Sequence, residues 1–189
     1  MIIKDFQLAH TINPNLFQSC LIYGPNEGLV RENIDLAYKT FADNSECERL
    51  FITSKQIDED PSILQNEMQS ISMFNPKKFI VLESLKEKHA TIIEECLSEN
   101  YDKTFLIVKL DNLTKSSKIR KLYENSKNHF SLACYDDDIK VLSSLVEKFQ
   151  KEHNITFDSD VKSFLLNNLS NDRMVIKNEL EKILLSLNK

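Results

Sequence analysis

Short apolar runs, rich in β-branched and aromatic residues, recur along the first 135 residues of the chain. Each run is continuously apolar rather than alternating, which favours strands covered on both faces of a parallel sheet. Stretches with apolar residues at helical spacing separate these runs. The alternation predicts an α/β three-layer domain with a five-stranded parallel sheet and right-handed crossovers. The predicted strands cover 20–23, 49–53, 78–83, 104–110 and 130–135, and the predicted helices cover 28–41, 61–73, 87–98 and 116–124.

The pattern changes after Tyr135. The aspartates 136–138 form a polar break, and only amphipathic helical patterns follow. We therefore expect an α/β domain at 1–137 and a small all-helical lid domain at 138–189. The last pattern reaches Lys189 without a clear C-cap, which suggests a fragment of something longer. Three helices are predicted, with these apolar positions: Leu142, Leu145, Val146 and Phe149; Val161, Phe164, Leu165 and Leu169; Ile176, Leu180, Ile183, Leu184 and Leu187.

Composition narrows the class of protein. Apolar residues make up 41% of the 189 residues, enough for a sizeable core. There is no apolar run of about 18 residues and no basic-then-apolar leader, so we expect a cytoplasmic protein without membrane contact. The net charge of −5 argues against strong autonomous DNA binding. Cysteines and histidines lack metal-site spacing, so no metal or disulfide is predicted: Cys20, Cys47, Cys96, Cys134, His10, His89, His129 and His153.

The two glycines of the chain lie in one stretch, LIYGPNEGLVREN, directly after the first predicted strand. A phosphate-binding loop reads G-x-x-x-x-G-K-[ST], in which the lysine neutralises phosphate and the hydroxyl holds magnesium. Gly24 begins that pattern, but Leu29, Val30 and Arg31 stand at the glycine, lysine and hydroxyl positions. We therefore interpret Gly24 and Gly28 as a vestigial nucleotide loop, kept as a tight turn with positive φ.

The acidic cluster of a nucleotide hydrolase is also missing. Such an enzyme needs carboxylates at the end of a neighbouring strand to hold magnesium and orient water. The sequence offers only Glu83 and Asp111, one after each strand. No catalytic residue, cofactor or ATPase activity is expected, and a live P-loop ATPase is the disfavoured rival.

The segment PSILQNEMQSISMF, at 61–74, offers a contact instead of a catalytic group. On a helix its stripe of Leu64, Met68 and Ile71 would face the sheet, whereas Met73 points about 180° away from Leu64. Met73 and Phe74 either fold back under the loop or form an exposed plug for a partner's pocket. A pair of large apolar side chains can be the hot spot of an interface.

These segments together resemble the delta subunit of the bacterial DNA polymerase III clamp loader. The resemblance covers nearly all of the chain and implies an AAA+-like fold. The matching stretches, in order, are LIYGPNEGLVREN, MQSISMFNPKKFIVLE, KLDNLTKSSKIRKLYENS, SLACYDDD and NDRMVIKNELEKI. Members of this family also carry a third, collar domain, which we expect this chain to lack.

The resemblance implies a non-catalytic subunit of the DNA polymerase III holoenzyme, which is a nucleotidyltransferase. In this family a hydrophobic pair inserts into the sliding clamp, the beta subunit, and favours ring opening during DNA replication. Met73 and Phe74 take that place here, with Met where Leu is common. Gln69 and Ile71 precede the pair at clamp-peptide spacing. The other implied partners are the remaining clamp-loader subunits and, indirectly, DNA.

Two alternatives remain at this stage. In the first alternative, the chain is a non-catalytic AAA+-like scaffold subunit that does not open the clamp directly. Against its being of the delta-prime kind, the sequence shows neither the zinc site nor the Ser-Arg-Cys motif of that kind. In the second alternative, the chain is a DNA-binding module whose basic run KSSKIRK contacts DNA phosphates. The net charge of −5 favours a solvated helix face for this run instead. The candidate phosphate contacts are Lys115, Lys118, Arg120 and Lys121.

Overall fold

A computed structural model describes residues 1–12, 17–70, 77–99, 101, 103–168 and 173–187. Its sheet is parallel throughout, with strands in the order β1-β6-β2-β5-β4-β3. The five predicted strands are confirmed, but the described sheet has six. The sequence missed β1, which is only two residues long and pairs with β6 at one edge. The strands are β1 (Ile2–Ile3), β2 (Ser19–Tyr23), β3 (Cys47–Thr53), β4 (Lys77–Glu83), β5 (Thr104–Leu110) and β6 (His129–Ala133).

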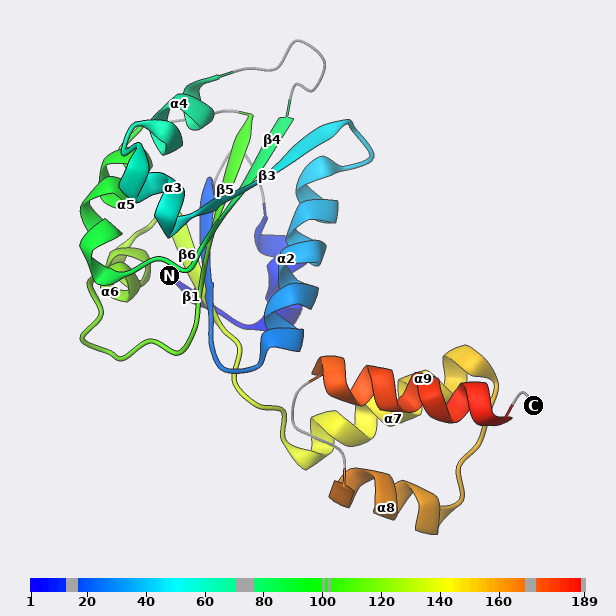
Figure 1. The fold of residues 1–189 in the computed structure, drawn as a ribbon. Helices are drawn as coiled ribbons and strands as arrows, with labels where there is room; N and C mark the ends of the chain where they lie inside the picture. The colour runs from blue at the N-terminus through cyan, green and yellow to red at the C-terminus, as the bar shows by residue number, and fades with distance from the viewer. Residues whose placement is uncertain (13–16, 71–76, 100, 102, 169–172, 188–189) are drawn as a thin grey trace. The chain divides into compact units, whose positions relative to one another are not determined.

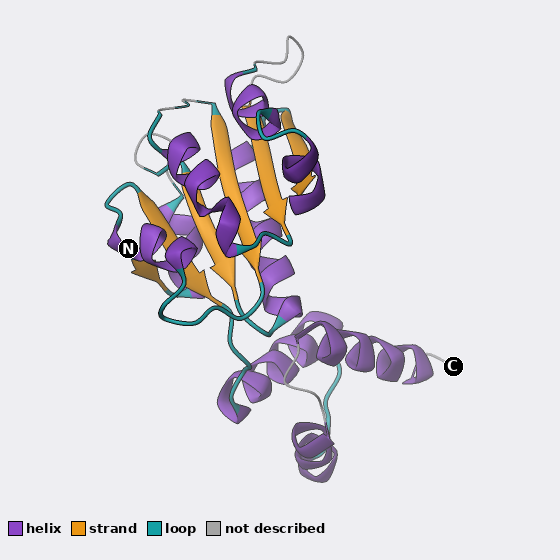
Figure 2. Cartoon of the chain, turned by 60° about the vertical axis from the view of Figure 1, so that its left-hand side comes forward, coloured by secondary structure: helices purple, strands orange, loops and turns teal. Residues whose placement is uncertain are grey.

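Helices cover both faces of this sheet, as Figures 1 and 2 show. The short α1 (Leu8–Thr11) and the long α2 (Glu27–Ala42) lie on one face. The other face carries α3 (Ser54–Glu59), α4 (Ile63–Gln69), α5 (Ala90–Leu97) and α6 (Lys118–Asn125). Two 3₁₀ turns, η1 (Asp5–Gln7) and η2 (Glu87–His89), precede α1 and α5.

Two details of the predicted helices were wrong. The sequence did not predict α3, which a capping box at Thr53 and Gln56 begins directly after β3. The predicted helix 61–73 is also too long, because α4 ends at Gln69 and Ser70 already has an extended backbone.

Strands β2, β4, β5 and β6 are buried on both faces, as their continuous apolar runs predicted, whereas the edge strand β3 is mostly half-buried and its Phe51 is 50% exposed. Leu106 and Val108 of β5 belong to the core cluster under α3 to α6. Phe105 points to the opposite face, where its ring lies 5.5 Å from that of Phe41 on α2. Phe79 stacks on Phe105 at 5.9 Å. An aromatic layer therefore attaches α2 to the sheet.

The remaining helices form a second compact unit with its own core. They are α7 (Ile139–His153), α8 (Ser159–Asn168) and α9 (Arg173–Leu187), which confirms the three predicted helices. Asp138 caps α7, since its Oδ1 accepts from the Val141 N–H at 2.9 Å. The core of this unit consists of Leu142, Val146, Phe149, Phe157, Leu165, Ile176 and Leu180.

The chain divides into two compact units, one of 1–24 and 30–134, the other of 25–29 and 135–189. The vestigial loop therefore contributes residues 25–29 to the helical unit. The expected bounds 1–137 and 138–189 stay a prediction. Within the described ranges, no helix combines the length and the apolar character needed to cross a bilayer.

Candidate functional site

Gly24 makes a turn that only glycine tolerates. Its φ is +144°, as the vestigial-loop interpretation predicted. A Cβ at this position would lie 2.0 Å from the carbonyl oxygen of Cys134. The Gly24 N–H donates to the Leu110 carbonyl at 3.3 Å. The predicted positive φ was wrong for Gly28, which lies inside the first turn of α2 because that helix begins at Glu27.

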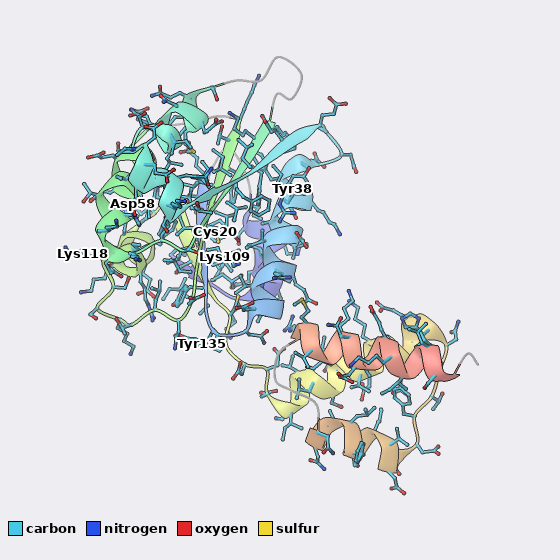
Figure 3. The ribbon with its side chains drawn as sticks, viewed as in Figure 1. Cys20, Tyr38, Asp58, Lys109, Lys118 and Tyr135 are labelled. Carbon is cyan, nitrogen blue, oxygen red and sulfur yellow. The ribbon has the colours of Figure 1, made fainter. Side chains whose placement is uncertain are left out.

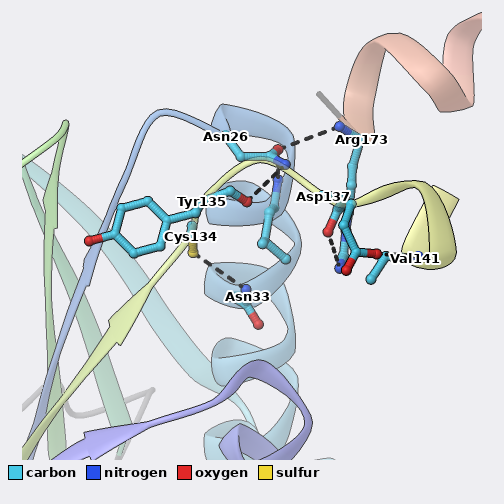
Figure 4. Close-up of polar contacts among 9 residues, drawn as sticks. Asn26, Asn33, Cys134, Tyr135, Asp137, Val141 and Arg173 are labelled. Atoms are coloured by element: carbon cyan, nitrogen blue, oxygen red, sulfur yellow. Dashed lines mark hydrogen bonds and ion pairs between the residues drawn. The ribbon is translucent and has the colours of Figure 1, made fainter. Parts of the chain in front are cut away.

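The start of α2 is capped by a side chain of the loop itself. Asn26 is fully buried, and its Oδ1 accepts from the Leu29 N–H at 3.0 Å (Figure 4). The first N–H groups of a helix are the groups with which phosphate loops bind an anion. In this chain an amide oxygen occupies that place.

The strand-end carboxylate of β4 has a lysine partner. The Lys109 ammonium lies 3.1 Å from Oε1 of Glu83, and both side chains are about 30% exposed. Lys109 lies on β5 and is labelled in Figure 3. Asp111 is exposed at the end of β5. Both acids line a cavity of about 440 Å³. In the part of the chain that the structure describes, no three His, Cys, Asp or Glu side chains gather as metal ligands would.

The end of α4 is fixed by a buried lysine of the next strand. Leu64 and Met68 are buried against the sheet, as predicted from the helical stripe. The Lys78 ammonium donates to the Glu67 carbonyl at 2.9 Å and to the Ser70 hydroxyl at 2.5 Å. It also pairs with the Glu67 carboxylate at 2.9 Å, while only 7% of the Lys78 side chain is exposed. This lysine thereby stops the helix at Gln69.

The candidate contact residues fall partly outside the described chain. Gln69 is exposed on the last turn of α4, where its Nε2 donates to Glu99 at 3.4 Å. Ile71, Met73 and Phe74 lie outside the described residues, so their roles stay predictions.

The basic run divides into exposed and engaged side chains. Lys115, Lys118 and Lys121 are exposed, and Figure 3 labels Lys118 on α6. The Arg120 guanidinium pairs with Glu124 at 2.7 Å and stacks over the Tyr23 ring at 5.2 Å. Of the four predicted phosphate contacts, the three lysines have the accessible geometry.

The cysteines are thiols rather than disulfides. Burial raises the pKa of Cys20 well above its usual value and raises the pKa of Cys96 to about 11. These thiols are therefore neutral at physiological pH and are poor nucleophiles.

The comparison that decides the family is a sequence match over most of this α/β unit. The model of the family described as "DNA polymerase III, delta subunit" matches residues 20–134. This range runs from β2 past β6 and contains the vestigial loop, α4 and the basic run.

The chain belongs to the DNA polymerase III delta subunit family.

Solved structures share the fold of this delta-family chain. The DNA clamp loader delta protein (YqeN) of Bacillus subtilis has a TM-score of 0.59 at 13% identity, covering 94% of this chain and 56% of that chain. AMPPCP-bound DnaA from Aquifex aeolicus has a TM-score of 0.58 at 15% identity, covering 94% and 58%. Domain III of the Thermotoga maritima replication initiation protein DnaA has a TM-score of 0.56 at 12% identity, covering 96% of this chain and 80% of that chain.

At these identities the likeness concerns the fold alone, and it confirms the predicted AAA+-like class with a C-terminal helical region. The delta-family chain spans 56% of the length of the Bacillus protein. A sequence search of curated proteins gave no match.

Sequence reasoning missed two polar residues that shape this delta-family site, Asn26 and Lys78. Asn26 precedes a helix start, which is a usable N-cap signal. Lys78 had no such signal. A lysine next to Lys77 at the start of a strand would be expected to face solvent, and only the structure shows that it binds the end of α4.

Proposed function

We propose that this chain is a non-catalytic clamp-loader subunit that binds the DNA polymerase sliding clamp and favours ring opening during DNA replication. The observation that carries the proposal is the delta-family match, because residues 20–134 include the whole candidate contact segment. Met73 and Phe74 are the proposed plug, with Gln69 and Ile71 beside it.

The contacts around this segment support the proposal. Before it, Ser70 is bound by the Lys78 ammonium at 2.5 Å. After it, the Lys77 ammonium donates to the carbonyls of Phe41 and Ala42 at 2.9 and 3.1 Å. The segment 71–76 therefore connects two anchored points. Anchoring both ends lowers the entropy lost when a partner is bound.

Energetics allow two side chains to carry the contact. Burying one large apolar side chain contributes about 1.5–3 kcal/mol, so Met73 and Phe74 together would contribute about 3–6 kcal/mol. To open the ring, the subunit must bind the open form more tightly than the closed form. That work needs no nucleotide on this chain. The missing P-loop lysine and hydroxyl, and the pairing of Glu83 with Lys109, agree with such a role.

The proposal also assigns partners. The remaining clamp-loader subunits would bind ATP and control when the plug is available, within the DNA polymerase III holoenzyme. DNA would be contacted indirectly, with Lys115, Lys118 and Lys121 as the accessible cations. The alternative is an AAA+-like scaffold subunit of the replication machinery that does not open the clamp itself.

The test is binding to the sliding clamp of the same organism, measured by surface plasmon resonance. Met73→Ala/Phe74→Ala should weaken binding by about 100-fold or more, the loss typical of hot-spot residues. A matched control is Met174→Ala/Phe164→Ala, which removes the same residue types from exposed positions of the helical unit. This control should bind like the wild type, and circular dichroism should show both variants folded.

A second arm tests opening. A clamp variant with a weakened ring interface should bind the wild-type subunit more tightly than the closed ring does. Equal affinity for the two forms would leave a clamp-binding protein that does not open the ring. No binding to either form would favour the scaffold alternative.

A further inference from the structure

The vestigial loop is bound by residues from two distant parts of the helical unit. Figure 4 shows Asn26 between the chain leaving β6 and the start of α9. Besides capping Leu29, its Oδ1 accepts from the Arg173 N–H at 3.4 Å, and its Nδ2 donates to the Tyr135 carbonyl at 3.5 Å. These two bonds are long, so Asn26 positions the segments more than it holds them.

The stronger contact is an ion pair beside Asn26. The Arg173 Nε lies 2.6 Å from Oδ2 of Asp137, and its Nη2 lies 3.0 Å from Oδ1. The geometry is bidentate, with side chains only 14% and 6% exposed. Asn26, Asp137 and Arg173 belong to the same compact unit. A guanidinium in such a fork binds either a carboxylate or a phosphate.

We propose that Asn26, Asp137 and Arg173 form a clasp that replaces a bound nucleotide. Asn26 supplies the acceptor that a phosphate would offer to the start of α2. Asp137 supplies the anion that a phosphate would offer to Arg173. The clasp thereby holds the vestigial loop, the chain after β6 and the start of α9 together in the absence of any ligand. This inference rests on the proposed non-catalytic role but not on clamp binding.

The burial of the pair explains why the clasp would matter. A charge that is largely removed from water and then loses its partner is strongly destabilised. Removing one member should therefore open the clasp locally rather than leave it unchanged. Local opening accelerates the exchange of backbone amide hydrogens in the segments that separate.

The experiment is hydrogen–deuterium exchange on the whole chain, read by mass spectrometry. Asp137→Asn should raise exchange at the starts of α2 and α9 by about tenfold or more, because it removes the carboxylate that binds the Arg173 guanidinium in two places. Asp136→Asn is the matched control, since Asp136 is next to Asp137 in sequence but has an exposed side chain. Peptides from β5 serve as the reference for an intact fold.

A double variant shows whether the two side chains act together. Asp137→Asn/Arg173→Gln should exchange no faster than either single variant, because each change already breaks the same ion pair. Magnesium and ATP at millimolar concentration should leave wild-type exchange unchanged.

Each result has a distinct meaning. The clasp is wrong, while the proposed function stands, if Asp137→Asn exchanges like Asp136→Asn. The same holds if the effects of Asp137→Asn and Arg173→Gln on exchange add in the double variant. If ATP slows wild-type exchange at these segments, both the clasp and the nucleotide-independent role are wrong. Clamp binding is measured separately, so its failure would leave this test unaffected.

Discussion

The two ends of the parallel strands differ in what their polar groups do. At the carboxyl ends, Gly24 closes against Cys134, and Glu83 pairs with Lys109. At the amino ends, the buried Lys78 reaches out of the sheet and fixes the last turn of α4. Ligands of open parallel sheets usually bind at the carboxyl ends. In this chain Glu83 and Lys109 pair there while Asp111 is exposed, and the proposed contact segment precedes β4 in the sequence, next to the opposite end of the sheet.

Under the proposed function, the contact would lie at the end of the sheet opposite to the one where ligands usually bind. Gly24 closes a tight turn at the carboxyl ends, while Val30 and Arg31 stand where a phosphate loop carries a lysine and a hydroxyl residue. The segment before β4 has no counterpart in that ligand chemistry. Fold alone therefore does not locate the site, and specific side chains must.

The largest expected effect comes from filling the carboxyl-end turn. Gly24→Ala should lower the free energy of unfolding by about 4 kcal/mol, because the backbone is strained for alanine and the new Cβ meets the Cys134 carbonyl. Urea unfolding followed by circular dichroism measures the loss. Gly28→Ala is the control and should cost at most about 1 kcal/mol, because alanine suits a helix. Equal losses would mean that the turn is not the constraint.

At the amino ends, removing the buried ammonium should have an intermediate effect. Lys78→Met keeps the apolar stem but loses the contacts with Glu67 and Ser70, so it should cost about 2 kcal/mol. If the proposed function is right, clamp affinity should fall as well, because the start of the plug segment loses its anchor. The exposed Lys103→Met is the control for unfolding and binding. A Lys78→Met variant that is as stable as the wild type, with unchanged amide hydrogen exchange in α4, would show that Lys78 does not fix the end of α4.

The smallest expected effect concerns pH at the same end of the sheet. Burial lowers the pKa of His129 below its usual 6.5, so the folded state favours the neutral ring. Unfolding then takes up a proton in acid, and stability should decrease as pH falls below about 6.5.

His129→Gln should flatten this slope of unfolding free energy between about pH 7 and pH 5. His10→Gln, at an exposed position, should leave the slope as it is. Identical slopes for both variants would show that His129 does not carry the pH dependence.

The sequence by itself determined five of the six strands in the described sheet, most of the helices and the residue types in the glycine loop. A strand buried on both faces must be mostly continuously apolar, and β5 is continuously apolar from Phe105 to Val108. The residues at the lysine and hydroxyl positions of the loop, Val30 and Arg31, are visible without any structure. Such features depend on residue type and local spacing alone.

Only the tertiary structure decided the details that depend on distant residues. The strand β1 exists because β6 offers it a partner about 130 residues away in sequence. The end of α4 is set by Lys78 from the following strand, and Arg173 pairs with Asp137, which lies 36 residues away in sequence. These contacts leave no periodic trace, because a hydrogen bond or ion pair needs two residues to meet in space, not any fixed separation along the chain.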